Sequence, residues 1–139
     1  MTALTQDRNT VRRDGLFASY PQAASTLIYA GALVCINTST GYATKGATST
    51  TLRAVGVSDL RSDNSAGAAG AVNVKVRRDG WFRFSNSAST DQVTLADVGA
   101  DCYIVDDQTV AKTSATSTRS VAGKVRDVDA DGVWIQFLV

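Results

Sequence analysis

The clearest alternation of apolar and polar residues lies in the middle of the chain. Over residues 72–77, three valines alternate with Asn, Lys and Arg, which places the valines on one face of a β-strand. Residues 78–80 (RDG) are typical of a turn, and the aromatic stretch 81–84 follows directly. The pattern therefore predicts a β-hairpin over residues 72–84.

Two further hairpins are predicted in the C-terminal half. Apolar segments at 120–125 and 133–137 flank the sequence DADG (129–132), and its Asp-Gly pair is a strong signal for a tight turn. A shorter strand over 102–105 turns at 106–108 and returns immediately.

Four short apolar segments predict strands in the N-terminal half. They lie at residues 27–29, 32–36, 42–44 and 54–58, with polar or glycine-containing turns between them. Gly56 falls inside the last segment, which predicts a bulge or a close approach of another backbone at that position.

The remaining segments are predicted to be loops, with one helical turn. Residues 45–51 and 63–70 are too small and polar to pack. Residues 92–99 are compatible with a short helical turn, capped by Thr94 and ended by Gly99.

These elements predict an all-β fold. About eight to ten short strands at regular spacing favour a small barrel or sandwich, with one short helical turn and an extended N-terminal arm. We expect a single β-rich domain over residues 21–139, and Pro21, the only proline, stands at its start.

Residues 1–20 are predicted to form the extended arm. They have no apolar periodicity, and arginines alternate with Asp7 and Asp14 before Gly15 ends the stretch. The alternative is an ordinary frayed terminus, which many domains have.

Composition supports strands over helices. All 13 acidic residues are Asp, and Asp prefers turns and helix caps. Ser, Thr and Val are abundant, whereas only ten residues are aromatic. We therefore expect a thin core, with part of the apolar surface buried by neighbouring subunits.

Several kinds of chemistry are not expected. The chain has no His, which excludes imidazole bases and the common zinc ligand, so we predict no catalytic residue, no metal, no cofactor and no small-molecule substrate. Residues 127–132 (DVDADG) match the first half of a calcium loop, but Leu138 stands where the closing Glu belongs, so a polar turn is favoured. Cys35 and Cys102 are expected to be buried thiols.

Charge and hydropathy argue against nucleic acid and membrane partners. The net charge is +1 without a basic block, and no apolar run approaches the roughly 18 residues of a membrane span. The polar N-terminus lacks the features of a signal peptide, which predicts synthesis in a cytoplasm. Arg77 and Arg78 near Trp81, Phe82 and Phe84 could stack on nucleic acid, but a core or a subunit interface is the favoured role of these aromatics.

Several segments of the chain resemble a known family. The arm pattern Thr5-x-x-Arg8-Asn9-Thr10-x-x-Arg13-Asp14-Gly15 is similar to the N-terminus of the small capsid cement, or head decoration, proteins of tailed phages and prophages. The resemblance covers most of the chain, and its further similar segments are 29–34 (YAGALV), 41–42 (GY), 54–57 (AVGV), 63–67 (DNSAG), 97–107 (DVGxxCYIVDD) and 122–125 (AGKV).

The resemblance implies a structural virion protein on the capsid exterior, made in the host bacterial cytoplasm. It implies a β-rich domain that binds the major capsid protein, commonly as a trimer, and stabilises the shell against packaged DNA. Another non-enzymatic virion component, such as a head-tail adaptor or a tail-associated β-barrel, is the alternative.

The sequence and the resemblance together give a hypothesis for the binding site. The arm is expected to order on the capsid as an added strand. Its arginines would pair with acidic groups, while Asn9 and Thr10 would form short-range hydrogen bonds. The expected arm residues are Thr5, Arg8, Asn9, Thr10, Arg12, Arg13 and Asp14, and the candidate subunit interface is formed by Trp81, Phe82 and Phe84.

Overall fold

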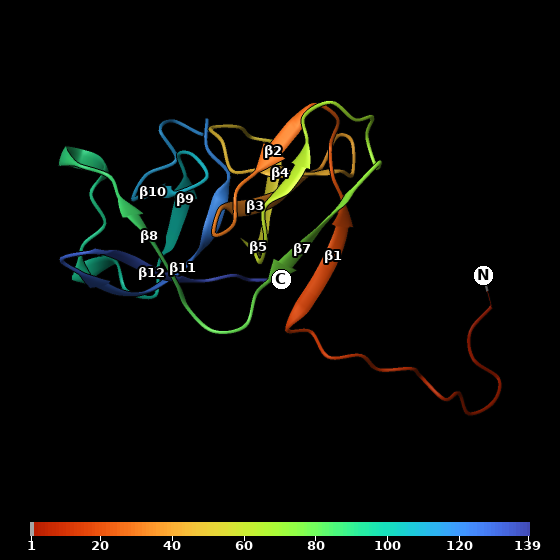
Figure 1. The fold of residues 1–139 in the computed structure, drawn as a ribbon. Helices are drawn as coiled ribbons and strands as arrows, with labels where there is room; N and C mark the ends of the chain where they lie inside the picture. Colours follow the sequence, from red (N-terminus) through yellow and green to blue (C-terminus); the bar gives the residue numbers. More distant parts are fainter. Residues whose placement is uncertain (1) are drawn as a thin grey trace.

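The computed structural model describes residues 2–139 and is built almost entirely of β-strands (Figure 1). The predicted all-β fold is confirmed, although the described residues hold twelve strands where eight to ten were expected. The strands are β1 (Phe17–Pro21), β2 (Thr26–Ile28), β3 (Leu33–Asn37), β4 (Ala43–Lys45), β5 (Leu52–Ser58), β6 (Ser62–Asn64), β7 (Asn73–Arg77), β8 (Phe82–Asn86), β9 (Asp101–Ile104), β10 (Thr109–Ala111), β11 (Val121–Asp129) and β12 (Gly132–Gln136).

The strands form a sheet and a barrel that lie side by side (Figure 1). The N-terminal half gives a five-stranded sheet in the order β1-β7-β5-β3-β4, and β2 and β6 form a separate two-stranded ribbon. The C-terminal half gives a closed barrel in the order β10-β8-β12-β11-β9. Closing the sheet removes free edges, so the barrel has no edge strand of its own.

One hydrophobic core joins the two halves. Leu33, Cys35 and Val57 from the sheet pack with Ile104 and Val133 of the barrel in a single buried cluster. A second cluster fills the other side of the sheet, beneath the β2–β6 ribbon. Most of β3 and β5 is therefore buried on both faces, which explains why residues 33–36 and 54–57 are apolar without alternation.

The predicted C-terminal hairpins are confirmed. Strand β11 pairs with β12 in antiparallel register from Lys124↔Gln136 to Asp129↔Gly132, with one bulge along the way. Strand β9 pairs with β10 through the predicted turn at 106–108. The close approach predicted at Gly56 is also present, because a Cβ there would lie 2.5 Å from the carbonyl oxygen of Arg77.

The hairpin predicted over residues 72–84 is wrong. The alternation in β7 is real, with Val74 and Val76 buried, but β7 lies between β1 and β5 in the sheet. Strand β8 pairs instead with β12 and β10 of the barrel. The turn at 78–80 is thus a crossing from one half of the body to the other. The residues of the turn correctly predicted a connection at this position. The strands that pair with β7 and β8, however, are determined by burial against strands more distant in the sequence.

The predicted boundary between arm and domain at residue 20 is also corrected. Residues Phe17–Pro21 form β1, which pairs with β7 along its whole length. Only Ala18 and Tyr20 of β1 are partly buried, so its apolar pattern is weak in the sequence. The arm is therefore residues 2–16, and residue 1 of the predicted arm lies outside the described residues.

Two loop predictions are refined. The loop predicted at 63–70 begins within β6, where the buried Asn64 side chain donates hydrogen bonds to the carbonyls of Ala23 and Ala68, both at 2.9 Å. The helical turn expected within residues 92–99 is present as the 3₁₀ helix η2 (Leu95–Asp97), and a second single-turn 3₁₀ helix, η1 (Ser89–Asp91), precedes that segment. In the described part of the chain, no helix has the length and apolar character needed to cross a membrane.

Candidate functional site: the N-terminal arm and its base

The arm has almost no contact with the rest of the chain. Residues 2–16 contain no strand or helix, and every one of them is exposed. All seven arm residues expected to bind a partner lie on this exposed segment. No ion pair found in residues 2–139 involves Arg8, Arg12 or Arg13. Figure 1 shows the arm running away from the body beyond the start of β1.

Arg78 fixes the base of the arm. Its backbone N–H donates to the carbonyl of Leu16 at 3.1 Å, and its Nε donates to the carbonyl of Gly15 at 3.0 Å. Its Nη1 also donates to the hydroxyl of Tyr20 at 3.0 Å. Arg78 therefore fixes the point where the arm leaves the body, and the chain bends there at Gly15 and Leu16. From the sequence, Arg78 was placed in a turn and beside the aromatics, and this role was missed because the pairing of β1 with β7 was not predicted.

The outer edge of β1 is open for pairing. Strand β1 stands at the edge of the sheet. The Leu16 carbonyl accepts from the N–H of Arg78, and the N–H of Gln22 donates to the carbonyl of Val72, so the even-numbered residues of β1 direct their backbone groups toward β7. The backbone groups of Phe17 and Ser19 consequently point away from β7. An edge of this kind, continuous with an extended arm, is suited to strand addition by a partner. Pro21 has no N–H and ends the available edge.

The three aromatics of the candidate interface separate into different environments. Trp81 is 53% exposed and precedes β8 on the crossing between sheet and barrel. Phe82 is half-buried, with the Arg77 guanidinium 5.6 Å from its ring centroid. Phe84 is buried in the barrel core, edge-on to Phe137 at 6.2 Å. Phe82 and Phe84 lie on the same face of β8, and because only 5% of Phe84 is exposed, Phe84 takes the core role instead of the interface role.

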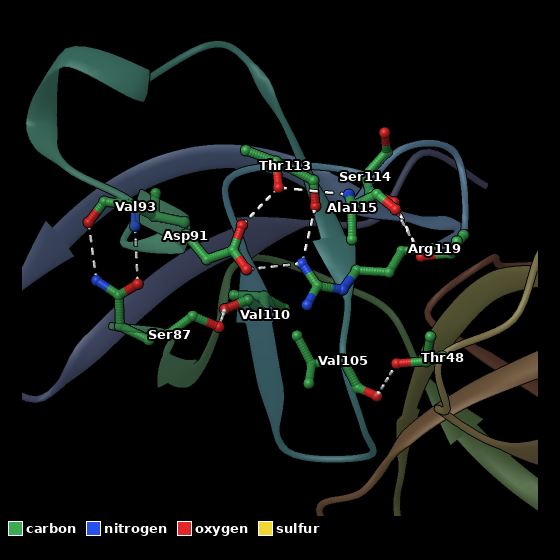
Figure 2. Close-up of polar contacts among 12 residues, drawn as sticks. Thr48, Ser87, Asp91, Val93, Val105, Val110, Thr113, Ser114, Ala115 and Arg119 are labelled. Atoms are coloured by element: carbon green, nitrogen blue, oxygen red, sulfur yellow. Dashed lines mark hydrogen bonds and ion pairs between the residues drawn. The ribbon is translucent and has the colours of Figure 1, made fainter. Parts of the chain in front are cut away.

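A polar network at the barrel was not predicted (Figure 2). The carboxylate of Asp91 accepts hydrogen bonds from the Thr113 hydroxyl and from Arg119 Nη1, the latter at 3.1 Å. The Thr113 bond, and secondarily Arg119, lowers the pKa of Asp91. Residues 115–117 all have positive φ, so this network holds a strained loop against η1. The residues lie 22 and 28 positions apart, and no local sequence signal connects them.

The turn with a partial calcium motif is held by its own hydrogen bonds. Asp129 accepts from the backbone N–H groups of Asp131 and Gly132 at 2.8 and 3.1 Å, and from the indole of Trp134 at 2.7 Å. The indole bond, followed by that of Asp131, lowers the pKa of Asp129. Among residues 2–139, no group of three or more side chains is arranged to hold a metal ion.

The two thiols are placed for packing. Cys35 and Cys102 are free and fully buried in the core shared by sheet and barrel. Burial raises the pKa of each thiol to about 12. A thiol with such a pKa is protonated at neutral pH and is a poor nucleophile.

Comparisons with known proteins give no relative of this chain. No family model matches it, and neither a curated protein nor a solved structure does.

Proposed function

We propose that this chain is a non-enzymatic structural protein of a phage virion, which binds the outer surface of the capsid and stabilises it. The observation that carries the proposal is the arm: 15 exposed residues, three of them arginines, leaving a packed β body at a fixed point. The resemblance to capsid cement proteins supports the same role.

The arm suits a partner that offers a strand edge and acidic groups. An extended, unpaired segment forms backbone hydrogen bonds when it adds to a sheet, and the open edge of β1 can continue that pairing. Arg8, Arg12 and Arg13 supply charge-assisted bonds to carboxylates of the major capsid protein. Ordering the arm costs conformational entropy, so a single arm binds weakly.

Assembly of several copies overcomes that weakness. In a trimer, binding of the first arm holds the second and third near their sites at high effective concentration. Three modest contacts then give a complex that dissociates slowly. The body supplies a rigid unit that spans neighbouring capsid subunits, and the exposed Trp81 is available for contacts between copies.

A truncation tests the proposal. Expanded shells assembled from the major capsid protein of the same phage or prophage are mixed with the intact chain or with a variant lacking residues 2–14, and bound protein is measured after pelleting. We expect the truncated variant to stay folded by circular dichroism and to lose binding. Asp131→Asn, a charge change at the exposed β11–β12 turn, is the matched control and should bind normally. Full binding by the truncated variant contradicts the proposal.

Copy number separates decoration from the alternative role. Hundreds of copies per particle, located on the shell exterior by cryo-electron microscopy, agree with decoration. Six or twelve copies at the head-tail junction or on the tail identify an adaptor or a tail-associated barrel.

A further inference from the structure

A cavity lies where the sheet meets the barrel. It has a volume of about 390 Å³ and is formed by the β2–β3 corner and the β9–β10 turn. Its lining residues are Tyr29, Ala30, Gly31, Ala32, Asp107 and Gln108. Pockets with a few polar groups between two packed units are common sites of recognition.

Asp107 brings an unused negative charge to this cavity. Its backbone carbonyl accepts from the N–H of Leu33 at 2.8 Å, so its position is fixed by the sheet. Within residues 2–139 its carboxylate has no hydrogen bond or ion pair, whereas the neighbouring Asp106 carboxylate accepts from the N–H of Gln108 at 2.9 Å. The Asp107 side chain is only partly exposed. A fixed, unpaired carboxylate in a cavity is complementary to a cation.

The arm base lies at the same end of the sheet as the cavity. Phe17 pairs with Arg77, Arg77 with Val57, and Val57 with Leu33, so these residues form one row across four strands. Leu33 follows the β2–β3 corner directly. Three strand spacings of about 4.8 Å place the cavity roughly 14 Å from the arm base.

The arm does not turn back toward its own cavity. The two bonds from Arg78 hold Gly15 and Leu16 at the start of β1, where the chain bends, and the arm then runs away from the body (Figure 1). An extended arm of 15 residues reaches about 50 Å, which is enough to reach a neighbouring molecule. The arm therefore carries unpaired arginines outward, while the cavity holds an unpaired carboxylate.

We propose that the arm of one copy docks on the next copy, where Arg12 or Arg13 enters the cavity and pairs with Asp107. The contact joins two different surfaces, so repeating it closes a ring when the rotation between copies permits. It does not depend on the capsid. Because it uses only one of these two arginines, the other one, Arg8 and the distal arm residues stay available to a shell. The Arg61 guanidinium already lies 5.5 Å from the Tyr29 ring centroid, so the incoming cation is directed to Asp107 and not to that ring.

Sedimentation velocity of the full chain, without shells and over a range of concentrations, tests this contact. We expect reversible self-association, and in Asp107→Asn the same association should require roughly tenfold or more higher concentration, as expected for loss of a charge-assisted bond. The double variant Arg12→Ala/Arg13→Ala should behave like Asp107→Asn. Asp131→Asn removes the same charge elsewhere and should associate as the unchanged chain does.

A charge swap gives a second readout. Asp107→Arg and Arg12→Asp/Arg13→Asp should each fail to associate alone, and a mixture of the two should associate again. A chain that stays monomeric at all concentrations overturns the proposal. So does Asp107→Asn associating normally, or normal association of the arginine double variant, which would mean that another segment fills the cavity. Because shells are absent, these outcomes are independent of capsid binding.

Discussion

The arm and the body satisfy their polar groups in different ways. In the body, backbone groups are bonded across strand pairs, and two apolar clusters hold the sheet, the barrel and the ribbon together. In the arm, side chains and backbone are exposed, and the bonds of Arg78 to Gly15 and Leu16 mark its attachment. Stability is therefore expected to reside in the body, and binding free energy in the arm.

The largest loss of stability is expected from a substitution that leaves a large cavity in the barrel core. Phe84→Ala removes a ring that is 5% exposed and packs edge-on to Phe137, and such truncations cost about 3–5 kcal/mol. Urea unfolding should show this loss. Trp81→Ala, three positions earlier on the exposed crossing, is the control and should change the free energy of unfolding much less. Equal losses would contradict the separate roles given to these aromatics.

Removing the side chain of Arg78 should affect the junction between arm and body. Arg78→Ala deletes the bonds to Gly15 and to the Tyr20 hydroxyl, and each such bond contributes about 1 kcal/mol. We expect a modest fall in stability and faster amide exchange around Leu16 and Phe17. Arg77→Ala, whose side chain instead lies over Phe82, provides the comparison and should leave exchange at Gly15 unchanged.

Acid should weaken the barrel loop that Asp91 holds. The pKa of Asp91 is lower in the folded protein, because of Thr113 and then Arg119, so its contribution is present above the ordinary Asp pKa near 4 and is lost as pH falls through the folded-state value. Asp91→Asn should lower the melting temperature at pH 7 and flatten its decline in acid. An unchanged acid profile would show that this network does not stabilise the loop.

Deleting the arm should have the smallest effect on stability. The variant lacking residues 2–14 retains Gly15, Leu16 and all of β1, so its free energy of unfolding should match that of the intact chain within about 0.5 kcal/mol. Urea denaturation of the two proteins measures the difference. A loss of several kcal/mol would mean that the arm packs on the body.

The sequence predicted strands better than it predicted their partners. Tight turns such as 129–132 specify a hairpin locally, and that hairpin is present. The turn at 78–80 has similar chemistry, yet β7 and β8 separate because each buries more against distant strands. Strand β1 was missed because Ala18 and Ser19 carry little apolar signal.

The candidate site was also predicted only where its residues form a local pattern. The exposed arm was predicted because its sequence has no apolar periodicity, but the predicted end at residue 20 lies four residues beyond the observed end at residue 16. Arg78 and Asp107 depend on long-range register, which brings residues 63 and 74 positions away to Gly15 and Leu33. Contacts over such sequence separations cannot be predicted from a local sequence pattern.

Hydrogen–deuterium exchange of the arm, measured free and on shells, tests the central claim most directly. In the free chain, at a concentration low enough to keep it monomeric, amides of residues 2–14 should exchange at the rate of an unstructured peptide, while β7 and β12 are protected. On shells the arm amides should become strongly protected and the body should change little. Arm amides that stay unprotected in a shell-bound protein, or that are already protected in the free chain, would contradict the assignment of binding to the arm.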